Sequence, residues 1–442
     1  MRRGAYTAAA SGVAVALAGL ASLVLAVAAS LQLPPSLQTG LIRATVVLFF
    51  SFMFLLVLRY LSLLWLGYLH YLHDGLPQHE EDDAAAFTPP VSIIVPAYNE
   101  GPIIAASIRS LLAQRYPRFE VLVVDDGSTD DTYRQAAAFS GRHGGVTVRV
   151  VSKGNSGKAG ALNTGIALSR YPFVLCVDGD SRLSENALRR MARHFRDPDV
   201  AAVAGNVKVV NRRGFWARLQ ALEYIEGHNM ARRAQGFMRA VNIIPGPVGM
   251  FRRETVQRLG GYDTDTYAED ADLTLKILAA GWRVEYDDGA LAWTEAPESL
   301  GALIKQRYRW TRGILQALRK QRRVLTDPQS FNTWLSVVMM LFEALLWPAM
   351  NVAGSIFFVT IAVAFGASAH LIAWWVLLTL LDLAAALYTV AIEREDLSLV
   401  PLAVAYRFVF VLLIDVAKLF ATVEEFMRVE MSWGKLERLG RI

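Results

Sequence analysis

Two aspartates separated by one glycine follow a short apolar run near the middle of the chain. The run Phe173–Val177 predicts a buried strand, and Asp178 and Asp180 come directly after it. In open α/β sheets, ligands bind at the carboxyl ends of such strands. Two carboxylates this close repel each other unless a cation lies beside them, and Mg²⁺ or Mn²⁺ prefers oxygen ligands together with a substrate phosphate. The triplet alone is also common in surface turns, so the hypothesis of a metal-held nucleoside diphosphate depends on its surroundings.

Two further predicted strands end in polar loops that belong to the same edge of the sheet. The apolar run 91–95 leads into Pro-Ala-Tyr-Asn-Glu, and the run 120–124 leads into Asp-Asp-Gly-Ser-Thr-Asp. One acidic loop at a strand end is ordinary turn chemistry, but three loops that converge on one edge indicate a ligand. The candidate ligand-binding residues of these two loops are Tyr98, Glu100, Asp125 and Asp126.

Strands and helices alternate through this part of the chain. Further strands are predicted at 147–151 and 200–204, and helices near 103–114, 131–140, 159–170 and 184–196. The alternation predicts an α/β domain with a mainly parallel sheet and right-handed crossovers. Lys158 lies where one of these helices starts, and a lysine at a helix amino end suits a diphosphate. The neighbouring glycines fit neither a dinucleotide-binding nor a P-loop fingerprint.

Two later segments of the same region contain further candidate residues. A glycine- and proline-rich turn at 245–251 allows the backbone to approach a ligand closely. Glu269 and Asp270 belong to an acidic cluster before a predicted helix at 273–280. Capping and the helix dipole explain such a cluster without any catalytic role, so its position in the chain does not decide its function.

A basic amphipathic stretch follows and contains Gln306, Arg309 and Trp310. The i, i+3, i+4 spacing places these three side chains on one helical face. Contact with lipid headgroups explains the other basic residues of the stretch. It does not explain a glutamine, an arginine and a tryptophan together, which suit a site where a sugar polymer meets a phosphate-bearing donor.

Long apolar segments flank the α/β region. The hydrophobic fraction is 54%, and each segment is long enough to cross a bilayer, which takes about 20 residues. The segments lie at about 7–31, 41–69, 335–366, 369–391 and 401–422. An uncleaved anchor is favoured over a signal peptide for the first of them. We therefore predict a multi-pass membrane protein with two helices in residues 1–75, an α/β domain with interfacial helices at 88–325 and further helices with a basic tail at 331–442.

The net charge of +5 does not indicate nucleic-acid binding. Much of the excess lies at 305–323, directly before the third apolar segment, where the positive-inside rule explains it. The single cysteine, Cys176, excludes an internal disulfide and fits a reducing compartment. Three full spans after a cytoplasmic domain would leave the basic tail outside, against the same rule. Either the last segment lies partly in the interface, or the stretch 335–366 is not one simple span.

Ionisable residues interrupt the carboxyl-terminal apolar segments. Such groups are costly at membrane depth and usually face a bundle interior or a wet path. A wet path of this kind would be lined with hydrogen-bonding groups. The ionisable residues are Glu343, Asp382, Arg407, Asp415 and Lys418.

The motifs together resemble glycosyltransferase family 2, the inverting enzymes of the GT-A fold. The resemblance covers about residues 90–325 and rests on Val-Pro-Ala-Tyr-Asn-Glu, Val-Asp-Asp-Gly-Ser-Thr-Asp-Asp-Thr, Lys-Ala-Gly-Ala-Leu-Asn, Asp-Gly-Asp and Gln-x-x-Arg-Trp. The last signature is similar to that of the processive membrane members, which are cellulose, chitin, hyaluronan and poly-N-acetylglucosamine synthases. The tail, residues 431–441, is also similar to that of poly-N-acetylglucosamine synthase-like proteins.

The resemblance implies a role for each candidate residue. Asp270 matches the family's catalytic base, with Glu269 as its neighbour, and Asp178 and Asp180 would hold Mg²⁺ or Mn²⁺ on the diphosphate. Ala268 replaces a frequent threonine, which we expect to be tolerated because the carboxylates carry the chemistry. The other implied contacts are Tyr98, Glu100, Asp125 and Asp126 to the nucleoside, Lys158 to the diphosphate, Gly246 and Pro247 to the acceptor, and Gln306, Arg309 and Trp310 at the acceptor entrance.

The resemblance also implies a function. It predicts a processive enzyme that polymerises N-acetylglucosamine from UDP-N-acetylglucosamine into a β-linked exopolysaccharide and passes it across the inner or plasma membrane. The catalytic domain would be cytoplasmic, and a separate small membrane subunit would supply any regulation. The alternatives are a hyaluronan- or chitin-type synthase, an inactive transferase-like scaffold or transport subunit, and a nucleotidyltransferase. The scaffold predicts loss of Asp178, Asp180 or Asp270, all of which are present, and a nucleotidyltransferase would not need the apolar segments.

Overall fold

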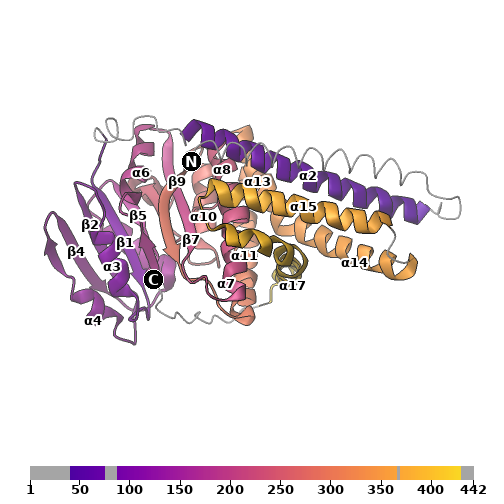
Figure 1. Cartoon of the computed structure of the whole chain (residues 1–442). Coiled ribbons are helices and arrows are strands. Elements are labelled where there is room, and N and C mark those ends of the chain that lie inside the picture. The colour runs from indigo at the N-terminus through magenta and orange to yellow at the C-terminus, as the bar shows by residue number, and fades with distance from the viewer. Residues whose placement is uncertain (1–39, 75–86, 366–368, 430–442) are drawn as a thin grey trace.

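The computed structural model describes residues 40–74, 87–365 and 369–429. An α/β domain lies at one end of the molecule, and long helices extend away from it (Figure 1). The apolar segment predicted at 7–31 and the basic tail at 431–441 lie outside the described residues.

One mixed sheet of nine strands forms the centre of the α/β domain, in the order β3-β4-β2-β1-β5-β8-β7-β9-β6. The strands are β1 Val91–Ala97, β2 Phe119–Asp125, β3 Gly141–His143, β4 Val146–Ser152, β5 Phe173–Cys176, β6 Ser181–Leu183, β7 Val200–Val209, β8 Gly249–Arg252 and β9 Arg283–Thr294. As predicted, β1 is parallel to β2 and β5, and β2 is parallel to β4. β8 is antiparallel to both of its neighbours, β5 and β7, and the edge pairs β3–β4 and β6–β9 are also antiparallel, so the sheet is mixed.

Helices cover both faces of the sheet and bury its central strands. In β1, Val91, Ile93 and Val95 face one hydrophobic cluster, whereas Ile94 faces the other. The first cluster includes α3 (Ile104–Leu112) and α6 (Ala187–Arg193), and the second includes α5 (Gly157–Leu168) and α10 (Glu269–Ala279). Because both faces are covered, the central strands are continuous apolar runs, which is why the sequence pattern locates them.

The pattern does not predict β8 and β9, for physical reasons that the structure shows. β8 has only four residues and follows a glycine- and proline-rich turn. β9 contains Asp287, Asp288 and Gly289 in its middle, where its pairing with β7 shifts register. A polar interruption of this kind breaks the alternation from which strands are recognised.

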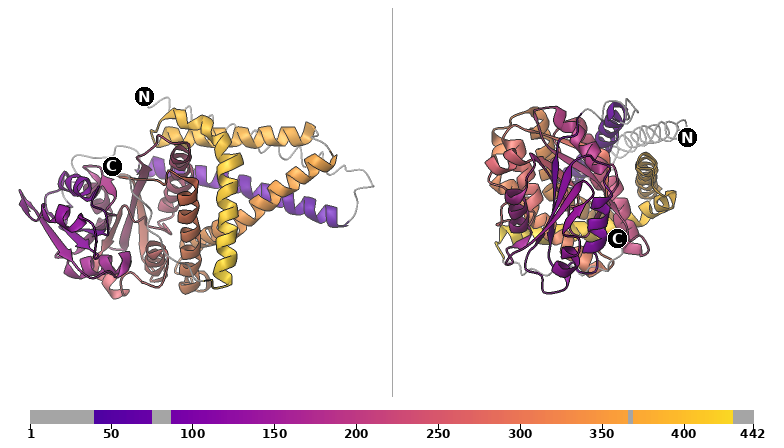
Figure 2. Two further views of the ribbon diagram at one scale, coloured as in Figure 1. Left: turned by 90° about the horizontal axis from the view of Figure 1, so that it is seen from below. Right: turned by 90° about the vertical axis from the view of Figure 1, so that its left-hand side faces the viewer.

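Within residues 40–74, 87–365 and 369–429, four helical stretches are long and apolar enough to cross a membrane, namely Phe54–Leu72, Phe331–Ile356, Trp375–Ile392 and Leu397–Phe426. They belong to α2 (Gly40–Asp74), α13 (Phe331–Leu341) with η5 (Phe342–Leu346) and α14 (Trp347–Phe365), α15 (Ala369–Ile392), and the series η6 (Leu397–Leu402), α16 (Ala403–Ala405), η7 (Tyr406–Val411) and α17 (Leu412–Phe426). α2, α14 and α15 extend away from the sheet (Figure 1). α17 instead runs across them, alongside α11 (Leu300–Lys320), as the left view of Figure 2 shows.

The remaining helices are short. They are α4 Thr132–Ala137, η3 His194–Arg196, α7 Phe215–Glu223, η4 Tyr224–Asn229, α8 Met230–Phe237, α9 Arg253–Arg258 and α12 Arg323–Thr326. α8 packs against α2, and α7 packs against η6 and η7. The α/β domain and the long helices therefore share an extensive contact.

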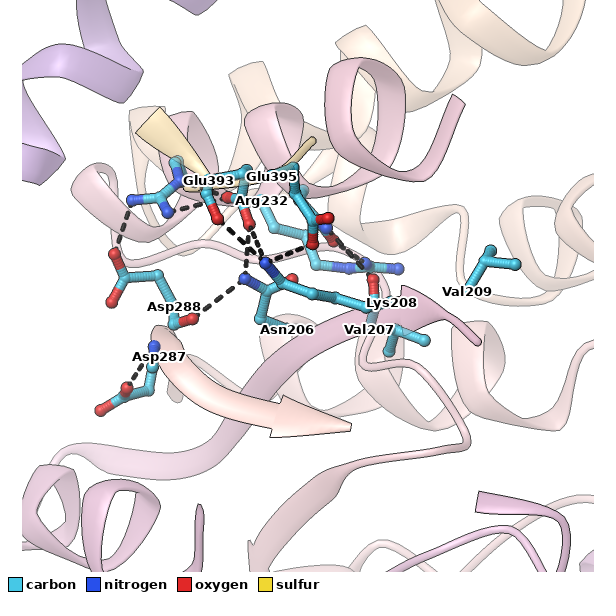
Figure 3. A network of polar contacts seen from close by, with 12 residues as sticks. Asn206, Val207, Lys208, Val209, Arg232, Asp287, Asp288, Glu393 and Glu395 are labelled. Carbon is cyan, nitrogen blue, oxygen red and sulfur yellow. Dashed lines mark hydrogen bonds and ion pairs between the residues drawn. The ribbon is translucent and has the colours of Figure 1, made fainter. Parts of the chain in front are cut away.

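A buried polar network fixes the end of α15 to the α/β domain (Figure 3). The carboxylate of Glu393, which directly follows α15, accepts hydrogen bonds from Arg233 at 2.8 and 2.9 Å and from Asn206 at 2.8 Å. The Lys208 ammonium donates to the Glu393 carbonyl at 3.1 Å and lies 2.8 Å from Glu395. Charged groups this deeply buried are stable only when paired, so the network holds α15 in one position. We call it the α15 latch.

Candidate active site

The strand register brings the three predicted loops to one edge of the sheet. Ala97 and Asp125 are paired at the ends of β1 and β2, and the Asp126 amide donates to the Ala97 carbonyl at 2.8 Å. On the other side of β1, the Val177 amide donates to the Ile94 carbonyl at 3.0 Å. Tyr98, Asp125 and Asp178 therefore lie at neighbouring strand ends, as the sequence predicts.

The two loops predicted for the nucleoside are tied to each other by hydrogen bonds. The Glu100 amide donates to the Thr132 hydroxyl at 2.7 Å, and the Thr129 amide donates to the Asn99 side-chain oxygen at 2.8 Å. Asn99 has a φ of +51°, a conformation that asparagine tolerates better than most residues. The Tyr98 ring is 37% exposed beside these loops, where a flat base has access to it.

Asp125 and Asp126 are buried, and their carboxylates are bound by the protein itself. Asp126 accepts hydrogen bonds from the Lys153 ammonium at 2.7 Å and from the Ser156 amide at 3.0 Å. Asp125 accepts one from the Ser152 hydroxyl at 2.9 Å. These aspartates therefore shape the loops, and the sequence analysis missed Lys153 because its partner is close only in the folded chain.

Lys158 connects the two acidic motifs across the site. Its ammonium lies 2.6 Å from an Asp178 oxygen and 3.2 Å from a Glu269 oxygen. Asp178 follows β5, and Glu269 begins α10, more than ninety residues later in the chain. The same pocket is lined by Lys158, Tyr262, Glu269, Asp270, Pro245 and Gly246. The predicted diphosphate, base and acceptor-loop residues thus meet in one place.

Gly246 lies against the Lys158–Asp178 pair, with no room for a side chain. A Cβ at this position would lie 2.6 Å from the Lys158 nitrogen and 2.8 Å from an Asp178 oxygen. We expect Gly246→Ala to displace this pair and to weaken binding of the predicted nucleoside-diphosphate ligand by about tenfold to a hundredfold, the effect of one hydrogen bond to a charged group. Titration of the purified protein with UDP measures the change.

Gly301, at the start of α11, provides the matched control for Gly246→Ala. A Cβ there meets nothing within 4 Å, so Gly301→Ala is expected to leave UDP binding unchanged. Equal UDP affinity in the two variants would show that the Gly246 loop does not set the position of Lys158 and Asp178.

Asp270 has the electrostatic environment of a base. Burial and the nearby Glu269 carboxylate raise the pKa of Asp270 to about 6, although Lys158 opposes the shift. Its Oδ1 accepts a hydrogen bond from the Ala271 amide at 2.8 Å, which fixes its orientation at the start of α10. A carboxylate with a pKa near 6 holds a proton more strongly than an ordinary aspartate and is still ionised at neutral pH.

The neighbouring Asp272 has a structural environment instead. It is completely buried, accepts a hydrogen bond from Gln321 at 3.0 Å and lies 3.3 Å from Lys320. It therefore joins α10 to the end of α11.

The carboxylate oxygens available at the sheet edge fit a divalent cation that is held together with a substrate. Within the described ranges, no group of three or more histidine, cysteine, aspartate or glutamate side chains is arranged around a metal position. Asp178 and Asp180 provide two carboxylates, and burial raises the pKa of Asp178, with the Lys158 ammonium opposing the shift and the nearby Asp180 carboxylate adding to it. Mg²⁺ is often bound by one or two carboxylates plus substrate phosphates, so this pair is sufficient. Asp178 and Asp180 remain the predicted ligands.

Gln306, Arg309 and Trp310 lie together on α11, as their spacing predicts. Ser299 starts this helix by accepting the Ala302 amide at 3.2 Å. The Arg309 guanidinium donates to the Tyr267 carbonyl at 3.4 Å, which brings α11 to the segment directly before Glu269 and Asp270. The structure therefore places this motif beside the acidic motif.

Arg307 is a residue of α11 that the sequence analysis missed. It is buried, lies 4.3 Å above the Trp310 ring and donates to Glu223 at 3.1 Å. The His228 ring meets the other side of this cluster, 6.0 Å from the Trp310 ring in an edge-on arrangement. Arg307 lies inside the Gln-x-x-Arg-Trp signature at a variable position, so only its contacts reveal that it orients Trp310.

A cavity of about 150 Å³ lies beside His228, where the α/β domain meets the long helices. We call it the junction cavity. It is lined from the domain by Glu223, Glu226 and His228, and from the long helices by Arg59, Tyr60, Glu343, Asp382, Arg407, Asp415 and Lys418, among others. The ionisable residues predicted to face a bundle interior all line it.

The comparisons with known proteins agree with this fold. The sequence model described as "Glycosyltransferase like family 2" matches residues 89–313. Because this match covers half of the chain, the protein belongs to that family. The solved mannosyltransferase PcManGT from Pyrobaculum calidifontis, in complex with GDP-Man and Mn²⁺, aligns with 94% of this chain and 99% of its own, at a TM-score of 0.61 and 22% identity. That likeness confirms the predicted GT-A fold class.

Curated relatives are similar over part of their length. Poly-beta-1,6-N-acetyl-D-glucosamine synthase of Staphylococcus aureus is 33% identical over 224 residues, and its counterpart from Staphylococcus epidermidis is 32% identical over the same length. Each alignment covers 50% of this chain and 54% of the relative. The chain thus spans about half the length of the curated relatives that it matches.

Proposed function

We propose that this protein is a processive, inverting glycosyltransferase that transfers N-acetylglucosamine from UDP-N-acetylglucosamine to a growing β-linked polysaccharide. The observation that carries the proposal is the meeting of two acidic motifs on Lys158, 2.6 Å from Asp178 and 3.2 Å from Glu269. This contact supports the proposal of a diphosphate site directly beside the candidate base. The choice of N-acetylglucosamine follows the curated relatives, which are named for polymers of this sugar.

In the proposed mechanism, each residue binds, orients or moves a proton. The loops after β1 and β2 bind the uridine, and Lys158 attracts the diphosphate. A Mg²⁺ or Mn²⁺ ion held by Asp178 and Asp180 would supply charge neutralisation for the leaving UDP. Asp270 removes the proton from the acceptor hydroxyl as that oxygen bonds to the sugar carbon, and the bond to UDP breaks.

The acceptor side continues from Trp310 into the junction cavity. An aromatic ring offers a flat apolar face for a sugar, and Arg307 and His228 hold the Trp310 ring in place. His228 lines the junction cavity, whose other lining residues include side chains of the long helices. We propose that the polymer enters this cavity after each addition.

We further propose that the protein is multi-pass and that its α/β domain and carboxyl terminus lie on the cytoplasmic side. The start of α13 is tied to the domain by the Asn242 amide, which donates to the Ser336 carbonyl at 3.0 Å, and the end of α15 is tied to it by the α15 latch. α14 and α15 therefore form an outgoing and a returning helix. Because α17 runs across them, the interfacial interpretation of the last segment is favoured (Figure 2).

Fusions with green fluorescent protein test this topology. A fusion after residue 442 is expected to fluoresce in the cytoplasm, and one truncated after Phe365 is expected to remain dark. A dark full-length fusion would mean that the last segment crosses the membrane.

The enzymatic proposal is tested with the purified full chain in lipid nanodiscs, Mn²⁺ and separate UDP-sugars. We expect UDP release and long product with UDP-N-acetylglucosamine alone, and digestion by a β-1,6-specific glycosidase would identify the linkage. A requirement for two donors would instead indicate a hyaluronan-type enzyme, and digestion only by a β-1,4-specific glycosidase a chitin-type enzyme. Failure to release UDP from any donor would contradict the proposed activity.

The rate of transfer is expected to fall on the acid side of pH 6. A base acts in its ionised form, and the pKa of Asp270 is raised to about 6, so the working form is present above that pH and is lost below it. An ordinary aspartate would keep its charge down to about pH 4. Initial rates of UDP release between pH 4.5 and 8, at saturating donor, give the pH–rate profile and locate its acid limb, which is the pH range over which the rate falls.

Glu269→Gln is the matched variant for the pH profile. It removes a carboxylate that raises the pKa of Asp270, so the acid limb should move to lower pH even if the rate is reduced. An acid limb that stays in the same place in this variant would assign it to another group.

A further inference from the structure

The junction cavity contains several ionisable side chains, and their pairing determines which ligands it accepts. Three cations line it, and each lies beside a carboxylate. Arg59 is 2.7 Å from Glu343, Arg407 is 2.8 Å from Asp382, and Lys418 is 3.6 Å from Asp415. Among the described lining residues, no cation is therefore left over to bind an anionic ligand.

Glu226 differs from the other acidic residues of the junction cavity because neither of its oxygens has a hydrogen-bond partner among the described residues. The side chain is only 9% exposed and lies on η4, a π-helical turn of the α/β domain. Buried polar groups are almost always hydrogen-bonded, and unusual turns of this kind often occur at functional sites. An unsatisfied carboxyl group that lines a cavity indicates a ligand with hydrogen-bonding groups.

The protonation of Glu226 supports the same conclusion. Burial, and then the Asp382 carboxylate, raise the pKa of Glu226 to about 8, although Arg407 and Arg59 oppose the shift. At neutral pH the side chain is mostly an uncharged carboxyl group, which donates one hydrogen bond and accepts others. A negatively charged ligand beside Glu226 would have no unpaired cation to bind among the described lining residues, and the Asp382 carboxylate would repel it.

His228 adds a second uncharged group at the entrance. Its Nε2 has no hydrogen-bond partner among the described residues, and burial lowers the pKa of His228 to about 4, so the imidazole is neutral. A neutral ring and a neutral carboxyl group match the hydroxyl and acetamido groups of a sugar, which also both donate and accept.

We infer that the junction cavity binds an uncharged saccharide unit through Glu226 and His228 and excludes chains that carry a carboxylate at that position. The inference rests on the proposed function, because the saccharide is the growing product. It also distinguishes the alternatives that the sequence left open, since a hyaluronan-type polymer carries a uronic acid in every second sugar.

The test measures saccharide binding by the full chain in nanodiscs with UDP and Mn²⁺ but no sugar donor. The probes are a β-linked N-acetylglucosamine pentamer and a pentamer of equal length with alternating glucuronate. The change in tryptophan fluorescence measures the binding of each probe. We expect the uncharged pentamer to bind at least about tenfold more tightly, and Glu226→Ala to weaken it by about tenfold, the effect of one or two buried hydrogen bonds. Glu254→Ala, at an exposed ion pair on α9, is the control and should change neither affinity.

A second variant tests the charge argument if Glu226→Ala does not fold. Glu343→Gln leaves Arg59 without its carboxylate, so we expect it to strengthen glucuronate binding by about tenfold. Equal binding of both pentamers by the unmodified protein would overturn the inference, as would unchanged glucuronate binding in Glu343→Gln. UDP release from UDP-N-acetylglucosamine is measured on the same samples. Its absence would refute the proposed function, whereas normal release without charge selectivity would refute only the inference.

Discussion

Replacing Asp270 with asparagine is expected to reduce sugar transfer by about 10²- to 10⁴-fold, the usual contribution of a general base. The asparagine side chain has the same size and still accepts the hydrogen bond from the Ala271 amide, so the start of α10 should be preserved. It does not take the proton of the acceptor hydroxyl at neutral pH. UDP release and polymer length, measured with UDP-N-acetylglucosamine, give the effect.

Two additional measurements make the Asp270→Asn result specific. UDP affinity shows whether the donor site is intact, and it should stay close to that of the unmodified protein. Asp272→Asn changes the next carboxylate of the same helix, which pairs with Lys320 and Gln321, so it should lower thermal stability more than the rate per folded molecule. UDP release and polymerisation at the normal rate in Asp270→Asn would refute its assignment as the base.

Removing the Glu393 carboxylate is expected to destabilise the attachment of α15 to the α/β domain. Glu393→Ala leaves Arg233 with Asp288 as a carboxylate partner, at 2.6 Å, and removes one of the two acceptors of the Asn206 side-chain amide, which keeps the Asp288 carbonyl. Breaking a buried ion pair by removing one partner costs about 3–5 kcal/mol when the remaining charge is unpaired, and because Asp288 still pairs with Arg233 we expect a cost near the lower end. The melting temperature of the purified protein in nanodiscs should therefore fall by several degrees.

Glu254→Ala is the matched control for Glu393→Ala, since Glu254 and Arg258 form an ion pair on the surface of α9, where both side chains are more than two-thirds exposed. Surface pairs contribute about 0–1 kcal/mol, so this variant should melt close to the unmodified protein. Equal melting temperatures for both variants would show that the α15 latch does not hold the two parts together.

Much of the nucleotide side of the site was predictable because it depends on local pattern. β1, β2 and β5 are buried on both faces, so they appear as continuous apolar runs, and parallel strands place their following loops on one edge. The positions of Tyr98, Asp125 and Asp178 follow from this geometry. The face of α11 with Gln306 and Trp310 follows in the same way from helical spacing.

Other features depend on contacts between residues far apart in the sequence. Lys158 is more than one hundred residues from Glu269, and the lack of space at Gly246 arises only when its loop folds over Asp178. A local sequence pattern carries no information about contacts between segments so far apart in the chain. From the sequence we expected alanine at position 268 to be tolerated. The structure adds that Ala268 packs against Gly313 of α11, where a Cβ on Gly313 would lie 2.5 Å from the Ala268 Cβ.

The sequence alone determined the class of fold, the strand-edge motifs and the presence of costly charged groups in apolar segments, because each of these is a property of short stretches. Only the tertiary structure decided which charges pair, and it therefore showed that Glu226 is left without a partner in the junction cavity. It also gave the crosswise direction of α17, which hydropathy does not contain. Pairing and direction are set by packing between distant segments, and packing is a property of the whole folded chain.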